Sequence, residues 1–168
     1  NIVIDGAAYR LRPVKLSDAQ FIIDIRLDDI ERNRFINKIS PDKAQQEEWI
    51  REYFLRDNDY YFVIENLLSG EPEGLISVYN IQDGKGEWGR WVIKKSSLAA
   101  IESVDLIFKA SFEYIGLSEV YCRTIEDNHS VVAFHDSLNE LRRGVIEKYV
   151  EINEAQFNVV EHYVTKEY

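Results

Sequence analysis

The chain has 168 residues, 45% of them hydrophobic and 30% charged, which fits one folded domain with a single core and excludes a disordered chain. Its formal net charge of −10 disfavours general nucleic-acid binding, which needs a basic surface. No apolar run approaches the roughly 20 residues that a membrane helix needs. One cysteine, Cys122, excludes an internal disulfide and favours a reducing compartment. We therefore expect a cytoplasmic protein that binds neither nucleic acid nor membrane, with Cys122 in its core.

The first half of the chain predicts a strand, two helices and three further strands. Residues 8–14 resemble a short strand, and apolar residues at helical spacing follow a cap at Ser17-Asp18. Ser40-Pro41 predicts the start of a second helix, with Ser40 as its cap. Residues 60–65, 74–79 and 87–93 are β-branched and aromatic runs typical of strands, and Asp83-Gly84 predicts a tight hairpin turn.

The second half of the chain alternates between apolar residues at helical spacing and runs typical of strands. Helical spacing over residues 98–112 predicts a long helix entered through Ser96-Ser97. Residues 120–125 indicate a strand, residues 130–138 a helix, and residues 145–152 and 157–164 two strands that can pair. The order β-α-α-β-β-β-α-β-α-β-β predicts one α/β domain over residues 1–168, with a mixed sheet and helices on both faces.

Several local patterns occur together in an order that resembles one family. Leu11-Arg12-Pro13-Val14, Gly74-Leu75-Ile76-Ser77, Glu87-Trp88-Gly89 and the Asn-containing residues 127–135 are similar to successive segments of the GNAT N-acetyltransferase superfamily. Gln45 and Trp49 resemble the second helix of its ribosomal-protein and amino-sugar-nucleotide branches. The resemblance covers nearly the whole chain and implies a GNAT-like fold of about seven mostly antiparallel strands.

The resemblance also implies acetyl-CoA as acyl donor, held at a turn of the form Gln/Arg-x-x-Gly-x-Gly/Ala before the long helix. Backbone N–H groups of this turn and the helix N-terminus bind pyrophosphate. The matching residues depart from the family where Leu98 replaces the first glycine, although lysine and serine side chains supply charge and donors. They are Lys95, Ser96, Ser97, Leu98, Ala99 and Ala100. We expect weakened or Lys/Ser-assisted cofactor binding.

Amide formation from an amine and a thioester needs a base, an oxyanion site and an acid for the leaving thiolate. The resemblance implies Glu87 as the base, acting through water, and backbone donors near Val92 and Ile93 for the oxyanion. His135 stands where the family often has a tyrosine acid, and an imidazole can deliver a proton at neutral pH. Asn128 matches a family asparagine that contacts the cofactor or caps the helix.

Each of these residues also has a purely structural interpretation. Glu87 can be an exposed strand end, and His135 a structural residue, with Tyr79 or Tyr121 as substitute acids. Asn139-Glu140 departs from the Gly-Phe that the family usually carries after this helix. His129, His162 and Cys122 have no metal-ligand spacing, so we expect no metal.

The loop after the first helix lines the acceptor site in the enzymes that the chain resembles. Arg26, Arg32 and Arg34 are therefore candidates for binding a nucleotide diphosphate. We expect a small amine substrate, first an amino-sugar nucleotide. The alternatives are a ribosomal-protein or peptide N-terminus or, in another class, an inactive GNAT-fold binding module. Unpaired edge strands favour a homodimer.

Overall fold

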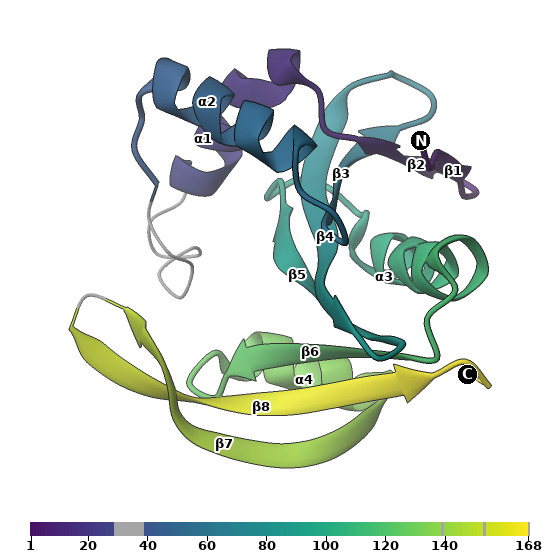
Figure 1. Cartoon of the computed structure of the whole chain (residues 1–168), viewed down its shortest axis with the longest axis vertical. Coiled ribbons are helices and arrows are strands. Elements are labelled where there is room, and N and C mark those ends of the chain that lie inside the picture. The colour runs from purple at the N-terminus through teal and green to yellow at the C-terminus, as the bar shows by residue number, and fades with distance from the viewer. Residues whose placement is uncertain (29–38, 139, 153, 168) are drawn as a thin grey trace.

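The computed structural model describes residues 1–28, 39–138, 140–152 and 154–167. Figure 1 shows one continuous sheet with helices around it. In chain order the elements are β1 (Ile4–Asp5), β2 (Tyr9–Pro13), a 3-10 turn (Leu16–Asp18), α1 (Ala19–Leu27), α2 (Lys43–Phe54), β3 (Tyr60–Asn66), β4 (Pro72–Gln82), β5 (Lys85–Ile93), α3 (Ala100–Lys109), a π-helical turn (Ala110–Ile115), β6 (Glu119–Ile125), α4 (His129–Ser137), β7 (Leu141–Ile152) and β8 (Ala155–Thr165).

The sheet has the strand order β1-β2-β3-β4-β5-β6-β8-β7 in the part of the chain that the structure describes. Every neighbouring pair is antiparallel except β5 and β6, which are joined by α3 as a crossover. The predicted mixed sheet is thus confirmed, with eight strands where about seven were expected. The difference is β1, a strand of two residues that pairs with β2 and is too short to carry a periodic signal.

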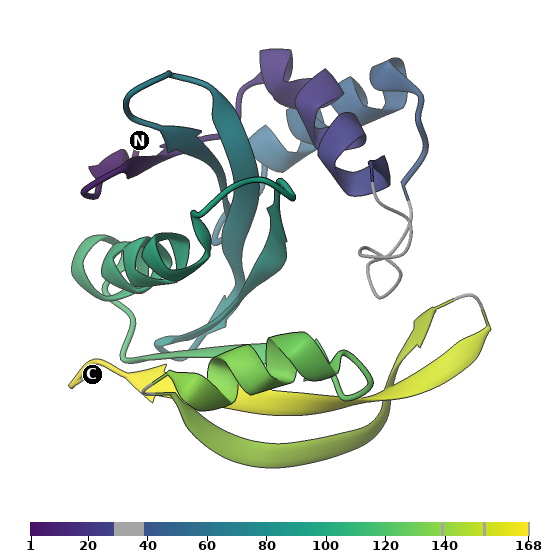
Figure 2. The same cartoon turned by 180° about the vertical axis from the view of Figure 1, so that it is seen from behind.

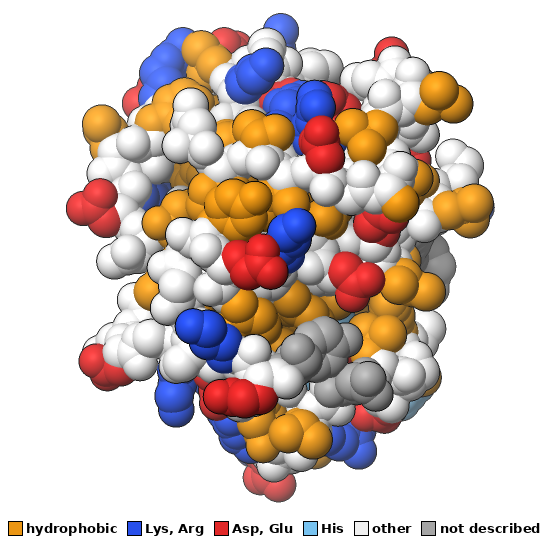
Figure 3. Space-filling model, turned by 90° about the vertical axis from the view of Figure 1, so that its right-hand side faces the viewer, with side chains coloured by type: hydrophobic (Ala, Val, Ile, Leu, Met, Phe, Trp, Pro, Cys, Tyr) orange, Lys and Arg blue, Asp and Glu red, His pale blue; other side chains and the backbone are white. Residues whose placement is uncertain are grey.

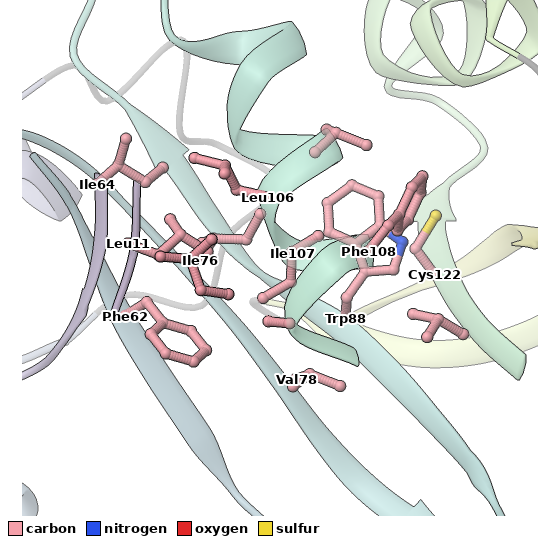
Figure 4. Close-up of a cluster of buried hydrophobic side chains, with 14 of the residues drawn as sticks. Leu11, Phe62, Ile64, Ile76, Val78, Trp88, Leu106, Ile107, Phe108 and Cys122 are labelled. Atoms are coloured by element: carbon pink, nitrogen blue, oxygen red, sulfur yellow. The ribbon is translucent and has the colours of Figure 1, made fainter. Parts of the chain in front are cut away.

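Alternating side chains of the central strands supply two cores, one on each face of the sheet. On one face Phe62 and Ile64 of β3 and Ile76 of β4 pack with α3 residues such as Ile107. Figure 4 shows this cluster, which extends along β5 to Trp88 and reaches Cys122 of β6.

The opposite face is covered by the two N-terminal helices. Val63 and Leu75 lie there among residues of α1 and α2, such as Ile22 and Ile50. Helices therefore pack on both faces, as the element order predicts. Figure 2 shows α4 lying over β6 and β8, apart from α1 and α2.

Two local predictions about turns had different outcomes. Asp83 and Gly84 have φ values of 54° and 77°, the left-handed pair that a tight hairpin between β4 and β5 requires. The predicted cap of α2 at Ser40 was wrong. The helix begins at Lys43 with Asp42 as cap, whose carboxylate accepts from Ala44 N at 2.9 Å. Ser40 Oγ instead accepts from Asp42 N at 3.1 Å. Asp and Ser cap helices equally well, so the sequence alone could not choose between them.

None of the described helices is long and apolar enough to cross a membrane. Figure 3 views the face on the side of β1, α3 and the C-terminus, where acidic, basic and hydrophobic side chains are interspersed. This face therefore carries no continuous basic surface of the kind that nucleic-acid binding needs.

Candidate active site

The site lies where two neighbouring strands separate. β5 and β6 pair over only three positions, ending at Glu87 and Tyr121. Beyond that point the last four residues of β6, from Cys122 to Ile125, pair with β8 and no longer with β5. The resulting wedge is a cleft of about 610 Å³. Its walls come mainly from β5, β6, α4 and the β7–β8 hairpin, and Arg26 of α1 and Ala100 of α3 also line it.

A β-bulge shapes the β5 wall of this cleft. Leu75 and Ser77 of β4 face Val92 and Gly89 of β5, so β5 carries an extra residue between them. Arg90, inside the bulge, has a φ of 47°, which costs a non-glycine residue about 1–2 kcal/mol. β6 pairs with β5 only as far as Glu87, and residues 89–93 of β5 line the cleft.

Charge and aromatic contacts hold Arg90 in that conformation. Its guanidinium donates to both carboxylate oxygens of Asp59, at 2.7 and 3.0 Å, with side-chain exposures of 23% and 10%. The same group lies 4.4 Å from the ring centroid of Tyr79 and 5.6 Å from that of Trp49. The bulge is thus fixed by side chains from three other segments.

Glu87 lies at the vertex of the wedge and is buried. Burial raises the pKa of its carboxyl above the usual glutamate range. Asn80, Arg123 and Tyr79 oppose that rise. Asn80 Nδ2 donates to Oε1 at 3.2 Å, and Arg123 Nη1 lies 3.8 Å from the same oxygen. Glu87 is therefore not an exposed strand end. A carboxylate with a raised pKa at the head of a cleft can accept a proton.

His135 lies on the opposite side of the wedge, on α4, and also lines the cleft. Its side chain is 2% exposed, and its ring centroid lies 5.3 Å from that of Trp88 on β5. Nδ1 is 2.7 Å from Oε2 of the buried Glu140. Asn128, the residue before α4, lines the cleft as well, but its side chain forms no cap hydrogen bond.

The loop before α3 divides the predicted cofactor residues into two groups. Ser97 and Ala100 line the cleft together with Val92 and Ile93. Ala99 is buried in the core beneath the loop. The other predicted residues, Lys95, Ser96 and Leu98, are exposed and are not part of the cleft wall.

The departure at Leu98 is not strained in this fold. Leu98 is 89% exposed, and its φ is not among the positive values of the described residues. The turn is thus reshaped so that no glycine is needed there. Ser97 Oγ donates to Glu73 at 2.6 Å and accepts from Ala99 N at 3.2 Å, which ties the loop to β4. The Ser97 hydrogen bond lowers the pKa of Glu73.

The part of the cleft where the predicted acceptor residues lie is basic and aromatic. Arg26 of α1 lines it, and burial lowers the pKa of its guanidinium. Arg123 of β6 donates to Tyr149 Oη at 2.6 Å, and both residues line the cleft. The other two predicted acceptor residues, Arg32 and Arg34, lie outside the described residues.

Sequence reasoning missed several cleft residues that the structure brings together, among them Arg90, Arg123 and Tyr149. A signal was present for two of them, because Arg90 and Arg123 interrupt otherwise apolar strands. Tyr79, named as a substitute acid, does line the cleft, whereas Tyr121 does not. Burial raises the pKa of the Tyr79 hydroxyl. No metal was expected, yet ligand atoms of Cys122, His135 and Glu140 lie within 4.8 Å of one another.

Comparison with solved structures gives full-length matches. FdhC, described as a nucleotide-linked sugar GNAT, is 28% identical with a TM-score of 0.82, covering 99% of this chain and 92% of that one. A variant of the spermidine N-acetyltransferase SpeG from Vibrio cholerae is 18% identical with a TM-score of 0.81, covering 96% and 95%. A GCN5-related N-acetyltransferase from Brucella melitensis is 18% identical with a TM-score of 0.84, covering 99% and 79%. The last two similarities show the fold alone.

No curated protein sequence matches the chain significantly. The family model for the acetyltransferase (GNAT) domain, however, matches residues 9–149. This match runs from β2 into β7 and contains both strands of the wedge, the loop before α3 and the whole of α4. The chain therefore belongs to the GNAT acetyltransferase family, and it is an N-acetyltransferase.

Proposed function

We propose that the chain transfers an acetyl group from acetyl-CoA to the amine of a nucleotide-linked amino sugar. The observation that carries the proposal is the cleft itself. It has a buried carboxylate, Glu87, at its vertex and the partly buried Arg26 and Arg123 on its walls, in a chain with a net charge of −10. Cationic side chains concentrated in a cleft of an acidic protein favour an acceptor that carries negative charge away from its amine.

The donor side of the cleft fits acetyl-CoA. The first N–H groups of α3 have no intrahelical partners, and Ala100, the first residue of this helix, lines the cleft. Such a helix start binds phosphate groups. Lys94 and Lys95 are exposed on the loop just before it and add positive charge. When bound there, acetyl-CoA supplies the acetyl thioester.

Different residues of this chain then accept a proton, stabilise the developing negative charge and donate a proton. Glu87 accepts a proton from the acceptor ammonium, directly or through water, because its raised pKa makes it a competent base. Backbone N–H groups of β5 near Val92 and Ile93 stabilise the negative charge that develops on the carbonyl oxygen. His135, on the other wall, donates a proton to the departing thiolate. Asn128 supports the cofactor at the start of α4.

The acceptor assignment rests on the arginines and on FdhC. Arg26 would bind the acceptor phosphates, and Tyr149 of β7 offers an aromatic ring against which a base can stack. FdhC, described as a nucleotide-linked sugar GNAT, is more similar in sequence to this chain than the spermidine enzyme, at 28% against 18% identity. A cationic polyamine would have to enter beside these guanidinium groups. A cytoplasmic location and a homodimer remain predictions.

An acceptor panel tests the proposal. The purified chain is first assayed for thermal stabilisation by acetyl-CoA, since a ligand that binds the native state must raise its stability. Release of CoA thiol is then measured with a nucleoside-diphosphate amino sugar, the same amino sugar without its nucleotide, spermidine and a short peptide. We expect the highest kcat/KM for the first, and competitive inhibition by the nucleoside diphosphate alone. A higher kcat/KM for spermidine or the peptide would overturn the acceptor assignment.

A further inference from the structure

Behind the wall of the cleft, the buried side chains of His135 and Glu140 form a pair. His135 is in the last turn of α4, and Glu140 precedes the first residue of β7. Their side chains are 2% and 0% exposed, and Nδ1 of the histidine is 2.7 Å from Oε2 of the glutamate. Of the two residues, only His135 lines the cleft.

The carboxylate makes one hydrogen bond where it has room for more. Oε1 of Glu140 is buried and has no hydrogen-bond partner among the described residues. A buried carboxylate normally has both oxygens satisfied, since an unsatisfied charged group costs several times a neutral one. Among the described residues, the side-chain hydrogen bond of Glu140 is the one to His135.

The geometry determines which nitrogen of His135 can work in the cleft. An ionised carboxylate only accepts hydrogen bonds, so Nδ1 must carry a proton in both the neutral and the charged ring. Trp88 and the His162 ring, with centroids at 5.3 and 5.2 Å, hold the imidazole plane in place. The nitrogen left for exchange with a ligand is Nε2.

The other titratable groups near the ring do not compete for this role. His162 of β8 has Nε2 at 2.8 Å from Asp136 Oδ1, so its proton at that nitrogen is directed to a different carboxylate. Cys122 of β6 is buried. Glu140 alone, among the described residues, is within hydrogen-bond distance of Nδ1 of His135.

We infer that Glu140 is a positioning residue of the transfer reaction, which holds the Nδ1 proton of His135 so that Nε2 faces the cleft as the proton donor. In the step itself, the Nε2–H of the imidazolium passes to the thiolate sulfur as the carbon–sulfur bond breaks. The ring is left neutral with its proton on Nδ1, and Nε2 regains a proton from solvent. The inference rests on the proposed role of His135.

The test compares Glu140→Gln with His135→Ala and with the double variant. The glutamine amide can donate to Nδ1 and so favours the opposite tautomer, with the neutral ring protonated at Nε2. We expect kcat to fall about 10- to 100-fold, within the range of general acid catalysis, with KM for acetyl-CoA nearly unchanged. Nitrogen-15 NMR of the imidazole should show Nδ1–H in the wild type and Nε2–H in the variant. In the His135→Ala background, Glu140→Gln should lower kcat no further.

Asp136→Asn is the matched control, because it removes the carboxylate from the neighbouring histidine and should leave kcat unchanged. If Glu140→Gln does not fold, Glu140→Asp retains the charge but retracts it from Nδ1, and the same loss of kcat is expected.

The outcomes separate the two claims. If His135→Ala leaves kcat intact, the proposed acid is wrong. If His135→Ala lowers kcat and Glu140→Gln does not, the role of Glu140 alone is overturned. It is also overturned if wild-type activity is lost to a chelator and restored by Zn²⁺, because the carboxylate would then be a metal ligand with His135 and Cys122.

Discussion

Replacing Asp59 with asparagine should weaken both the fold and the reaction, because this carboxylate holds the bulge that forms the β5 wall. Asn has the same shape but only one acceptor oxygen, so it cannot keep both contacts with Arg90, now at 2.7 and 3.0 Å. The variant leaves a largely buried guanidinium without its counter-charge. It also removes the restraint that keeps Arg90 at a φ of 47°.

The size of the effect follows from exposure. Breaking a fully buried ion pair costs about 3–5 kcal/mol, and an exposed pair contributes about 0–1 kcal/mol. With side chains 10% and 23% exposed, the Asp59–Arg90 pair lies nearer the buried limit, so we expect a loss of about 2–3 kcal/mol. For a chain of this length that lowers Tm by about 4–12 °C. A shifted bulge displaces its N–H groups, which should reduce kcat/KM about 10- to 100-fold.

The assay is thermal unfolding combined with thiol-release kinetics. Arg56→Gln is the matched control, because Arg56 contacts the same carboxylate at 3.3 Å but is 41% exposed. It should cost no more than about 1 kcal/mol and leave kcat/KM unchanged. Equal Tm values for Asp59→Asn and Arg56→Gln would mean that the Asp59–Arg90 pair does not hold the bulge. So would a loss of stability in Asp59→Asn with full retention of kcat/KM.

Three further variants or treatments test single residues. Glu87→Gln should lower kcat/KM about 10²- to 10⁴-fold without lowering Tm at pH 8. Burial raises the pKa of Glu87, so the protonated carboxyl stabilises the wild type below the ordinary glutamate pKa. That contribution is lost as pH rises through the raised pKa, whereas glutamine does not titrate. A lower Tm for the variant than for the wild type at pH 8 would contradict this. Cys122 is 5% exposed with a raised pKa, so mass spectrometry after iodoacetamide should find it unmodified in native protein and alkylated in guanidinium; rapid native labelling would refute its burial. Leu98→Gly should leave the affinity for acetyl-CoA within about twofold and lower the free energy of unfolding by about 0.4–1 kcal/mol. The reason is that residue 98 is exposed and has no left-handed φ. Markedly tighter binding of acetyl-CoA to the variant by calorimetry would mean that the leucine does impair the turn.

The sequence predicted the order of the elements well because each strand and helix carries its own period. Phe62 and Ile64 alternate with Tyr61 and Val63, and the structure sorts them onto opposite faces of the sheet. The same local reasoning predicts nothing about register. The bulge at Arg90 arises because β4 and β5 differ by one residue between two paired positions, and no local pattern in either strand records that difference.

The candidate site was predictable to the extent that its residues fall within family-like motifs. Glu87, His135 and Asn128 were named from such segments, and the structure brings all three to the cleft. The contacts that tune them come from elsewhere in the chain. Arg123 approaches Glu87 from the next strand in the sheet, and Glu140 was noticed only as a departure from a family pattern. Pairs of this kind form when distant segments pack together, so neither partner is distinctive in the sequence.

Stability and chemistry occupy different parts of this fold. The cores around β2, β3 and β4 are almost wholly apolar. Apart from Asp18, the buried acidic and histidine side chains of the described residues lie on β5 at the vertex or on the β6, α4 and β8 side of the wedge: Glu87, Glu119, His135, Glu140, Glu161 and His162. Burying such groups is unfavourable unless each finds a partner. The apolar cores packed on β2, β3 and β4 stabilise the domain. The part formed by β6, α4, β7 and β8 can therefore hold buried ionisable groups that a smaller fold could not bury. These two parts of the fold meet at Glu87, where β5 and β6 separate.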